Sequence, residues 1–111
     1  MPEFSTPFAG DDLGRKYDRD ELIRAVRFSI AAEYEAVQFY EQVMNATDDK
    51  EVLAIFRDIT EEEVMHAGQF ISLLERISPE DKKKYEEGFK ENTELWEKAG
   101  VGRKMILPGQ R

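Results

Sequence analysis

Three side chains in this sequence have the types and spacing to hold a metal ion: Glu33, Glu63 and His66. Glu63 and His66 are three residues apart, which places both side chains on one side of a helix. Glu33 and Glu63 each stand where the surrounding hydrophobic pattern calls for an apolar residue. A carboxylate in an apolar stripe is costly unless something pairs with it. We therefore expect these residues, including the only histidine of the chain, to bind a metal.

The spacing Glu-x-x-His is weak evidence by itself, because any glutamate-rich helix offers it by chance. Glu62, four residues before His66, is an alternative ligand, although Glu63 lies better on the apolar stripe. A second interpretation is that Glu63 and His66 only pair by a hydrogen bond. The metal hypothesis gains weight because Glu33 interrupts one apolar stripe and Glu63 interrupts another.

Two long amphipathic segments carry these residues. The first helix is expected to begin near Asp18, where Glu21 completes a capping-box spacing, and to end around residues 45–47. The second is expected to begin at Asp48, with Glu51 at the same spacing. Apolar residues recur at helical intervals in both segments. They are Leu22, Val26, Ile30, Val37, Tyr40 and Met44 in the first, and Leu53, Phe56, Ala67, Phe70, Leu74 and Ile77 in the second.

The short connection between these helices predicts an antiparallel hairpin. Glu33 lies about 14 residues before a turn near residue 47 and Glu63 about 16 residues after it, so at ~1.5 Å per residue their heights differ by only ~3 Å. Glu33, Glu63 and His66 are therefore predicted to meet at one level of the hairpin.

The remaining segments are shorter. Ser78, Pro79 and the acidic pair that follows predict a third helix that ends at Gly100. We expect a helical domain over residues 18–100 and a flexible arm over residues 1–17. Residues 101–111 are interpreted as a tail, either a linker or a docking peptide.

Composition excludes several classes of protein. The 111 residues suit one domain, and 16 basic against 24 acidic residues give a net charge of -8. Such a chain is expected to attract cations and to repel nucleic acid. The absence of cysteine excludes a thiolate site and a rubredoxin-like iron centre. No apolar run approaches the ~20 residues of a membrane span, and no signal-peptide core is visible, so a cytoplasmic location is expected.

The metal-binding residues amount to half of a known inventory. Di-iron carboxylate bundles use one glutamate from each of two helices and a Glu-x-x-His from each of two others. This chain offers one of each, on two long helices. We therefore predict an all-α fold in which a two-helix hairpin with a shorter C-terminal helix completes a ferritin-like four-helix bundle by dimerisation. Carboxylates and imidazole suit Fe(II), and also Mn(II) or Zn(II); with iron, bridging carboxylates would bring two ions together for oxidation by O2.

Two further residues are candidates for supporting roles. Tyr40 lies two turns beyond Glu33 on the same face, as a hydrogen-bond donor or electron source near the metal or as a core aromatic. Glu35 points away from Glu33 and is either part of a route by which ions reach the site or a surface carboxylate.

Two stretches, residues 30–40 (IAAEYEAVQFY) and 57–67 (RDITEEEVMHA), resemble the encapsulated ferritins, two-helix ferritin-like proteins housed in encapsulin nanocompartments. The resemblance covers roughly residues 18–98. It implies a ferroxidase site of Glu33, Glu63 and His66 at a two-fold interface, a decamer built as a pentamer of dimers, and delivery of Fe(III) to an enclosing encapsulin shell.

The sequence departs from the family pattern at two positions. Ala32 stands where an acidic residue often precedes the ligand glutamate, and Phe39 stands where a tryptophan is common. The function expected is an iron-oxidising enzyme inside an encapsulin compartment. A metal-stabilised helical assembly without turnover and a cargo or adaptor module are the alternatives.

Overall fold

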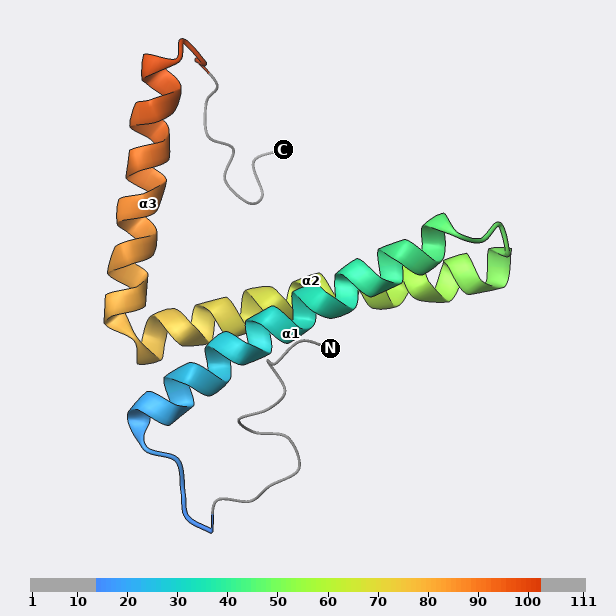
Figure 1. Ribbon diagram of the computed structural model, residues 1–111, viewed down its shortest axis with the longest axis horizontal. Coiled ribbons are helices and arrows are strands. Elements are labelled where there is room, and N and C mark those ends of the chain that lie inside the picture. The colour runs from blue at the N-terminus through green and yellow to red at the C-terminus, as the bar shows by residue number, and fades with distance from the viewer. Residues whose placement is uncertain (1–13, 103–111) are drawn as a thin grey trace. The chain divides into compact units, whose positions relative to one another are not determined.

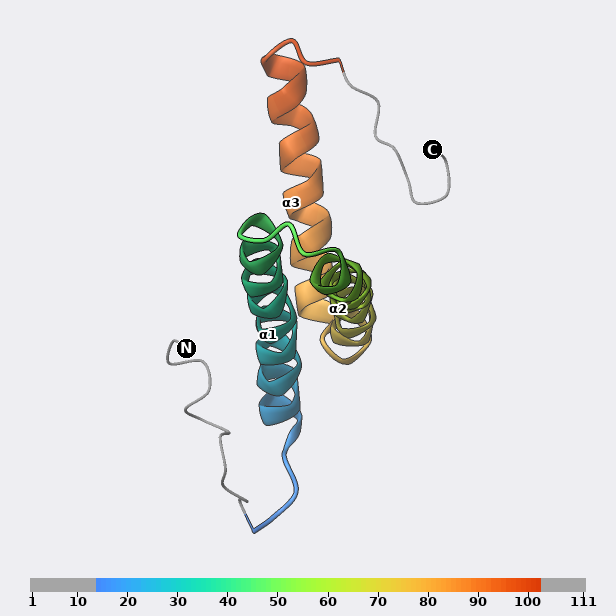
Figure 2. The same ribbon diagram turned by 90° about the vertical axis from the view of Figure 1, so that its right-hand side faces the viewer.

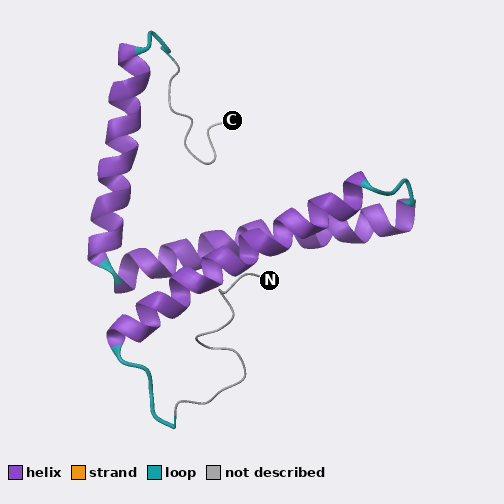
Figure 3. Ribbon diagram, viewed as in Figure 1, coloured by secondary structure: helices purple, strands orange, loops and turns teal. Residues whose placement is uncertain are grey.

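The computed structural model describes residues 14–102, which form three helices and no strand. They are α1 (Arg19–Asn45), α2 (Lys50–Ile77) and α3 (Pro79–Lys98), shown in Figures 1 and 3. The predicted all-α fold is confirmed. Within the described residues, no helix combines the length and apolarity that a membrane crossing requires. The predicted N-terminal arm and C-terminal tail lie almost entirely outside these residues.

The start of α1 has the predicted capping box. The Asp18 carboxylate accepts a hydrogen bond from the Glu21 backbone N–H at 2.8 Å, and the Glu21 carboxylate accepts one from the Asp18 N–H at 3.0 Å. Arg15 donates to both Glu21 oxygens at 2.7 and 3.0 Å. These hydrogen bonds, first the one from Arg15 and then the one from Asp18, lower the pKa of Glu21 to about 2.

The prediction that Asp48 caps α2 is wrong by one residue. The helix begins at Lys50, and Asp49 precedes it in an extended conformation. The Asp49 carboxylate accepts hydrogen bonds from the backbone N–H groups of Glu51 and Val52 at 2.9 and 3.1 Å. The Thr47 hydroxyl accepts one from the Asp49 N–H at 3.1 Å, which sets the turn so that the second aspartate, rather than the first, meets the helix end.

α1 and α2 pack side by side as an antiparallel hairpin, as predicted (Figure 2). Val37 on α1 and Ala67 and Leu74 on α2 are buried between them. Nearer the turn, the rings of Tyr40 and Phe56 meet edge to face with centroids 5.6 Å apart. At the opposite end the Arg19 guanidinium donates to the Ile77 carbonyl, so the start of α1 is joined to the end of α2.

The hairpin buries little of its apolar surface within one chain. Large apolar side chains on both helices are more than a third exposed: Leu22, Tyr34, Phe39, Ile55, Ile59, Val64, Met65 and Leu73. On α2, Ile55, Ile59 and Leu73 lie along one line, because their spacings of four and fourteen residues are close to whole turns of the helix. The hairpin therefore has an exposed apolar line on α2.

Helix α3 belongs to a second compact unit, which begins at Pro79. Pro79 is the first residue of the helix, and Glu80 and Asp81 lie in its first turn, as the sequence predicts. None of its residues is buried. It ends before Gly100, whose φ of 75° provides the left-handed conformation that terminates many helices.

Candidate metal centre

The mid-sections of two antiparallel helices place the three predicted ligands together. Glu33 lies near the middle of α1, one turn before the buried Val37, so its side chain points into the contact with α2. Glu63 and His66 lie one turn apart near the middle of α2, beside the buried Ala67. The helical spacing and the antiparallel pairing thus bring Glu33, Glu63 and His66 to one level.

The donor atoms are spaced closely enough for one ion. One atom from each of Glu33, Glu63 and His66 lies within 4.8 Å of the others, and all three side chains are partly buried. His66 Nδ1 is 3.8 Å from Glu33 Oε2. Ligands about 2.0–2.2 Å from a metal lie about 3–4 Å from one another, so the cluster needs only a small side-chain movement to close on an ion. The His66 side chain is 43 % exposed, which leaves it room for that movement.

One carboxylate oxygen of Glu33 makes no hydrogen bond. This atom, Oε2, is buried without a hydrogen-bond partner among the described residues, and the Glu33 side chain is only 17 % exposed. The pKa of Glu33 is raised because Glu63 lies close enough to share a proton with it. Burial and the Glu63 charge raise it further, while His66 acts in the opposite direction. Two close carboxyl groups with an unsatisfied oxygen fit a divalent cation, which would replace the shared proton.

His66 lies in line with exposed apolar residues of α2. Ile55, Ile59, His66 and Leu73 lie at helical intervals along one line of α2, and the three apolar members are 59 %, 37 % and 43 % exposed. His66 therefore stands within an exposed apolar stripe. The three donors among the described residues are fewer than a two-metal carboxylate site uses.

The neighbouring acidic residues and Tyr40 lie outside the cluster. Glu61 and Glu62 are exposed, and Glu62, the alternative ligand, does not join the three donors. Glu35 has a buried Oε2 without a hydrogen-bond partner among residues 14–102, although it does not join the three donors. Tyr40 packs its ring against Phe39 and Phe56. Its role near the metal and that of Glu35 stay predictions.

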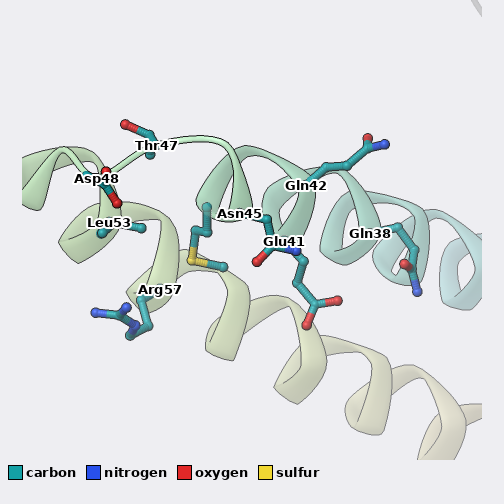
Figure 4. Close-up of a pocket in the computed structure, with 9 residues that line it drawn as sticks. Gln38, Glu41, Gln42, Asn45, Thr47, Asp48, Leu53 and Arg57 are labelled. Carbon is teal, nitrogen blue, oxygen red and sulfur yellow. The ribbon is translucent and has the colours of Figure 1, made fainter.

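Sequence reasoning did not predict a hollow at the turn of the hairpin (Figure 4). It has a volume of about 690 Å³ and is lined by the last turns of α1, by Thr47 and Asp48, and by Leu53 and Arg57 of α2. It is an open groove that includes none of the three candidate ligands. Its lining side chains come from two helices and a turn, so no local sequence pattern predicts it.

A helical hairpin with this carboxylate–imidazole cluster is a ferritin-like fold. Residues 13–92 match the model of the EncFtn-like family. The chain belongs to that family. The crystal structure of the encapsulated ferritin domain from Pyrococcus furiosus superposes with a TM-score of 0.71 at 34 % identity, covering 79 % of this chain and 88 % of that one.

Two curated relatives are similar in sequence. One is a ferritin-like–encapsulin shell fusion protein of Pyrococcus furiosus, 36 % identical over 73 % of this chain. The other is the encapsulin nanocompartment cargo protein EncC of Myxococcus xanthus, 38 % identical over 60 % of this chain. The chain spans 24 % and 51 % of these two proteins. The resemblance to encapsulated ferritins is therefore confirmed at the level of family and fold.

Proposed function

We propose that this protein is a ferroxidase that oxidises Fe(II) to Fe(III) with O2 at a site formed by two copies of the chain. The observation that carries the proposal is the cluster of Glu33, Glu63 and His66 around an unpartnered buried carboxylate oxygen. Two copies would supply four carboxylates and two imidazoles, the inventory of a di-iron carboxylate site. Fe(II) is the substrate here, and hard oxygen ligands suit both its oxidation states.

Each residue has a distinct part in this proposal. Glu33 and Glu63 supply negative charge that favours Fe(III) over Fe(II), and their carboxylates bridge two ions, which brings both within reach of one O2 molecule. His66 supplies a neutral nitrogen ligand that fixes the geometry. Two Fe(II) ions give up one electron each, and O2 accepts both electrons together with two protons from solvent and leaves as H2O2. The exposed stripe around His66 supports the two-fold pairing that completes the set.

The names of the relatives suggest where the reaction occurs. One relative is fused to an encapsulin shell and the other is an encapsulin cargo protein. By analogy, we propose that this protein also works with an encapsulin shell, inside a nanocompartment in the cytoplasm, as a dimer or as a decamer of five dimers. Fe(III) would pass to the shell interior for storage.

Paired glutamine variants test the ferroxidase proposal. Glu63→Gln removes a ligand charge while keeping the side-chain volume, and Glu62→Gln makes the same change at the exposed neighbouring position. In an aerobic stopped-flow assay we expect Glu63→Gln to slow Fe(II) oxidation at least about a hundredfold, as loss of a metal-site ligand or its support does. The Glu62→Gln variant should retain the wild-type rate. Wild-type kinetics in Glu63→Gln would exclude the proposed site.

A metal-stabilised assembly without turnover is the second candidate, favoured by the exposed apolar stripe beside His66. Oxygen consumption separates the two functions. A structural site would tighten association on addition of Fe(II) and consume no O2, whereas a ferroxidase consumes O2 in proportion to the iron added.

A further inference from the structure

Helix α3 presents an uncovered aromatic stripe. Tyr85, Phe89 and Trp96 follow one line of the helix, at spacings of four and seven residues, and Lys82 continues this line toward the N-terminus. Phe89 and Trp96 are 65 % and 51 % exposed. Large apolar side chains on one line of a helix with this exposure indicate a surface that another segment covers.

The charged residues of α3 are distributed unevenly around this stripe. One edge of the stripe, the charged edge, carries Glu86, Lys90 and Glu97. Most of the other charged residues lie farther round the helix, more than about 100° from Phe89: Glu80, Lys83, Lys84, Glu87, Glu91, Glu94 and Lys98. The charged edge, together with Lys82, therefore decides which partner the stripe accepts.

An antiparallel second copy of α3, centred on Phe89, brings opposite charges together along this edge. In an antiparallel pair the charged edges of both helices lie side by side, because reversing one helix also exchanges its edges. Lys82 lies seven residues before Phe89. Trp96 and Glu97 lie seven and eight residues after it. Lys82 of each copy therefore faces Trp96 and Glu97 of the other, where the indole face and the carboxylate both attract its ammonium group.

A second pair of contacts lies nearer the centre. Glu86 lies three residues before Phe89, and Lys90 lies one residue after it. In the antiparallel pair, Glu86 of one copy and Lys90 of the other therefore differ in level by only ~3 Å along the helix axis. Lys83, the base nearest to the charged edge, lies close to the level of Glu97 of the other copy and adds to the attraction. Each contact occurs twice, because the two copies are equivalent.

A parallel pair has none of these contacts. It joins the charged edge of one helix to the opposite edge of the other, which carries Asp81 and Leu95 and no base. The base closest to that opposite edge, Lys84, already pairs with Glu87 of its own helix at 3.0 Å. The two copies of Lys82 would also meet, and like charges repel. The charges therefore favour the antiparallel pair.

We propose that α3 is an interface at which a second copy of this chain binds antiparallel, about a two-fold axis at Phe89, with Lys82 of each copy on Trp96 and Glu97 of the other. The inference goes beyond the proposed function, because α3 belongs to a different compact unit from the three candidate metal ligands and the contact needs no metal.

Two charge reversals test this contact. Lys82→Glu and Glu97→Lys each place like charges at both symmetric positions of the interface, so we expect either variant to raise the dissociation constant of this association about tenfold. Within one helix the two positions lie ~22 Å apart, so they cannot compensate each other inside one chain. Both substitutions suit the helix dipole, since one adds an acid near the N-terminus and the other a base near the C-terminus. Loss of the helix would therefore not explain weaker association.

An equimolar mixture of the two variants identifies the partner. In a mixed pair the two altered side chains face each other with opposite charges, and the two unaltered ones do as well, so the mixture should associate as tightly as the unmodified chain. The measurement is sedimentation velocity of the whole chain over a concentration series with a chelator present. Glu94→Lys, the same change on the back of the helix, is the matched control and should leave association unchanged. Association that is unchanged in both reversal variants, or that the mixture fails to restore, would overturn the proposal.

Cysteine cross-linking tests the direction of the pair, because the sequence contains no cysteine of its own. Phe89→Cys places the two thiols at the two-fold axis and should give a disulfide-linked pair on oxidation. Trp96→Cys places them ~21 Å apart along an antiparallel pair and should stay reduced. A disulfide in Trp96→Cys, or none in Phe89→Cys, would contradict the antiparallel arrangement.

Discussion

At the scale of single residues, the chemistry of this protein depends on where one carboxylate lies. Glu33 is held in the contact between α1 and α2 with a buried oxygen that no described group satisfies. In the absence of metal this arrangement is unfavourable, because the raised pKa of Glu33 means that the folded state disfavours its charge. A residue so placed is expected to reduce apo-protein stability and to favour cation binding.

Glu33→Gln tests this expectation through stability. The pKa of Glu33 is higher in the folded than in the unfolded chain, so the penalty is absent below the unfolded value, grows as pH rises, and is complete above the folded value. We expect Glu33→Gln to stabilise the metal-free protein at pH 7 by about 1 kcal/mol, the order of an unsatisfied buried acceptor.

The measurement is thermal unfolding with a chelator present over pH 4–7. The stabilisation by Glu33→Gln should shrink as pH falls toward the ordinary glutamate range, and Glu62→Gln, which changes an exposed side chain, should have no such effect. An equal effect of Glu33→Gln at every pH would show that charge burial is not its cause.

At the scale of helices, single capping side chains set the starts of α1 and α2. The sequence predicts these capping residues to within one position. The capping box at Asp18 was predictable because Glu21 stands at the required spacing. The same spacing from Asp48 to Glu51 misled the prediction for α2, because Asp49 is an equally good capping residue and the turn geometry decides between them.

Alanine substitutions at these two aspartates test that assignment. Asp49→Ala removes the acceptor for the Glu51 and Val52 N–H groups and is expected to cost about 1 kcal/mol of unfolding free energy. Asp48→Ala, one residue earlier and also exposed, should change stability by less than about 0.5 kcal/mol. Urea denaturation of the two variants measures both values, and the reverse order would restore Asp48 as the cap.

Helical periodicity predicts the level of each residue along the hairpin, but it does not predict how the side chains pack. Hydrophobic spacing and residue counting from the turn sufficed to bring Glu33, Glu63 and His66 to one level, because helix rise is regular. The unpartnered oxygen of Glu33 and the groove at the turn were not predictable, because both depend on side-chain packing rather than spacing. The contact of Tyr40 with Phe56 was likewise not predictable, because it also depends on side-chain packing.

At the scale of the whole molecule, one chain contributes fewer long helices and fewer metal donors than a di-iron four-helix bundle uses. One hairpin supplies two long helices, a thin core centred on Val37, Ala67 and Leu74, and three metal donors. The similarity to an encapsulated ferritin domain confirms the fold. The exposed residues Ile55, Ile59 and Leu73 lie along the same line of α2 as His66. In the proposed function, the pairing of two chains would supply both a larger core and further ligands.

The proposed two-chain iron site can be tested with crystals of the whole chain soaked anaerobically in Fe(II) and measured at the iron absorption edge. We expect two iron peaks related by a two-fold axis, between the Glu63 side chains of two copies, with Glu33 and His66 of each copy as further ligands. Iron held within a single chain away from any two-fold axis, or no iron at Glu33, Glu63 and His66, would contradict it.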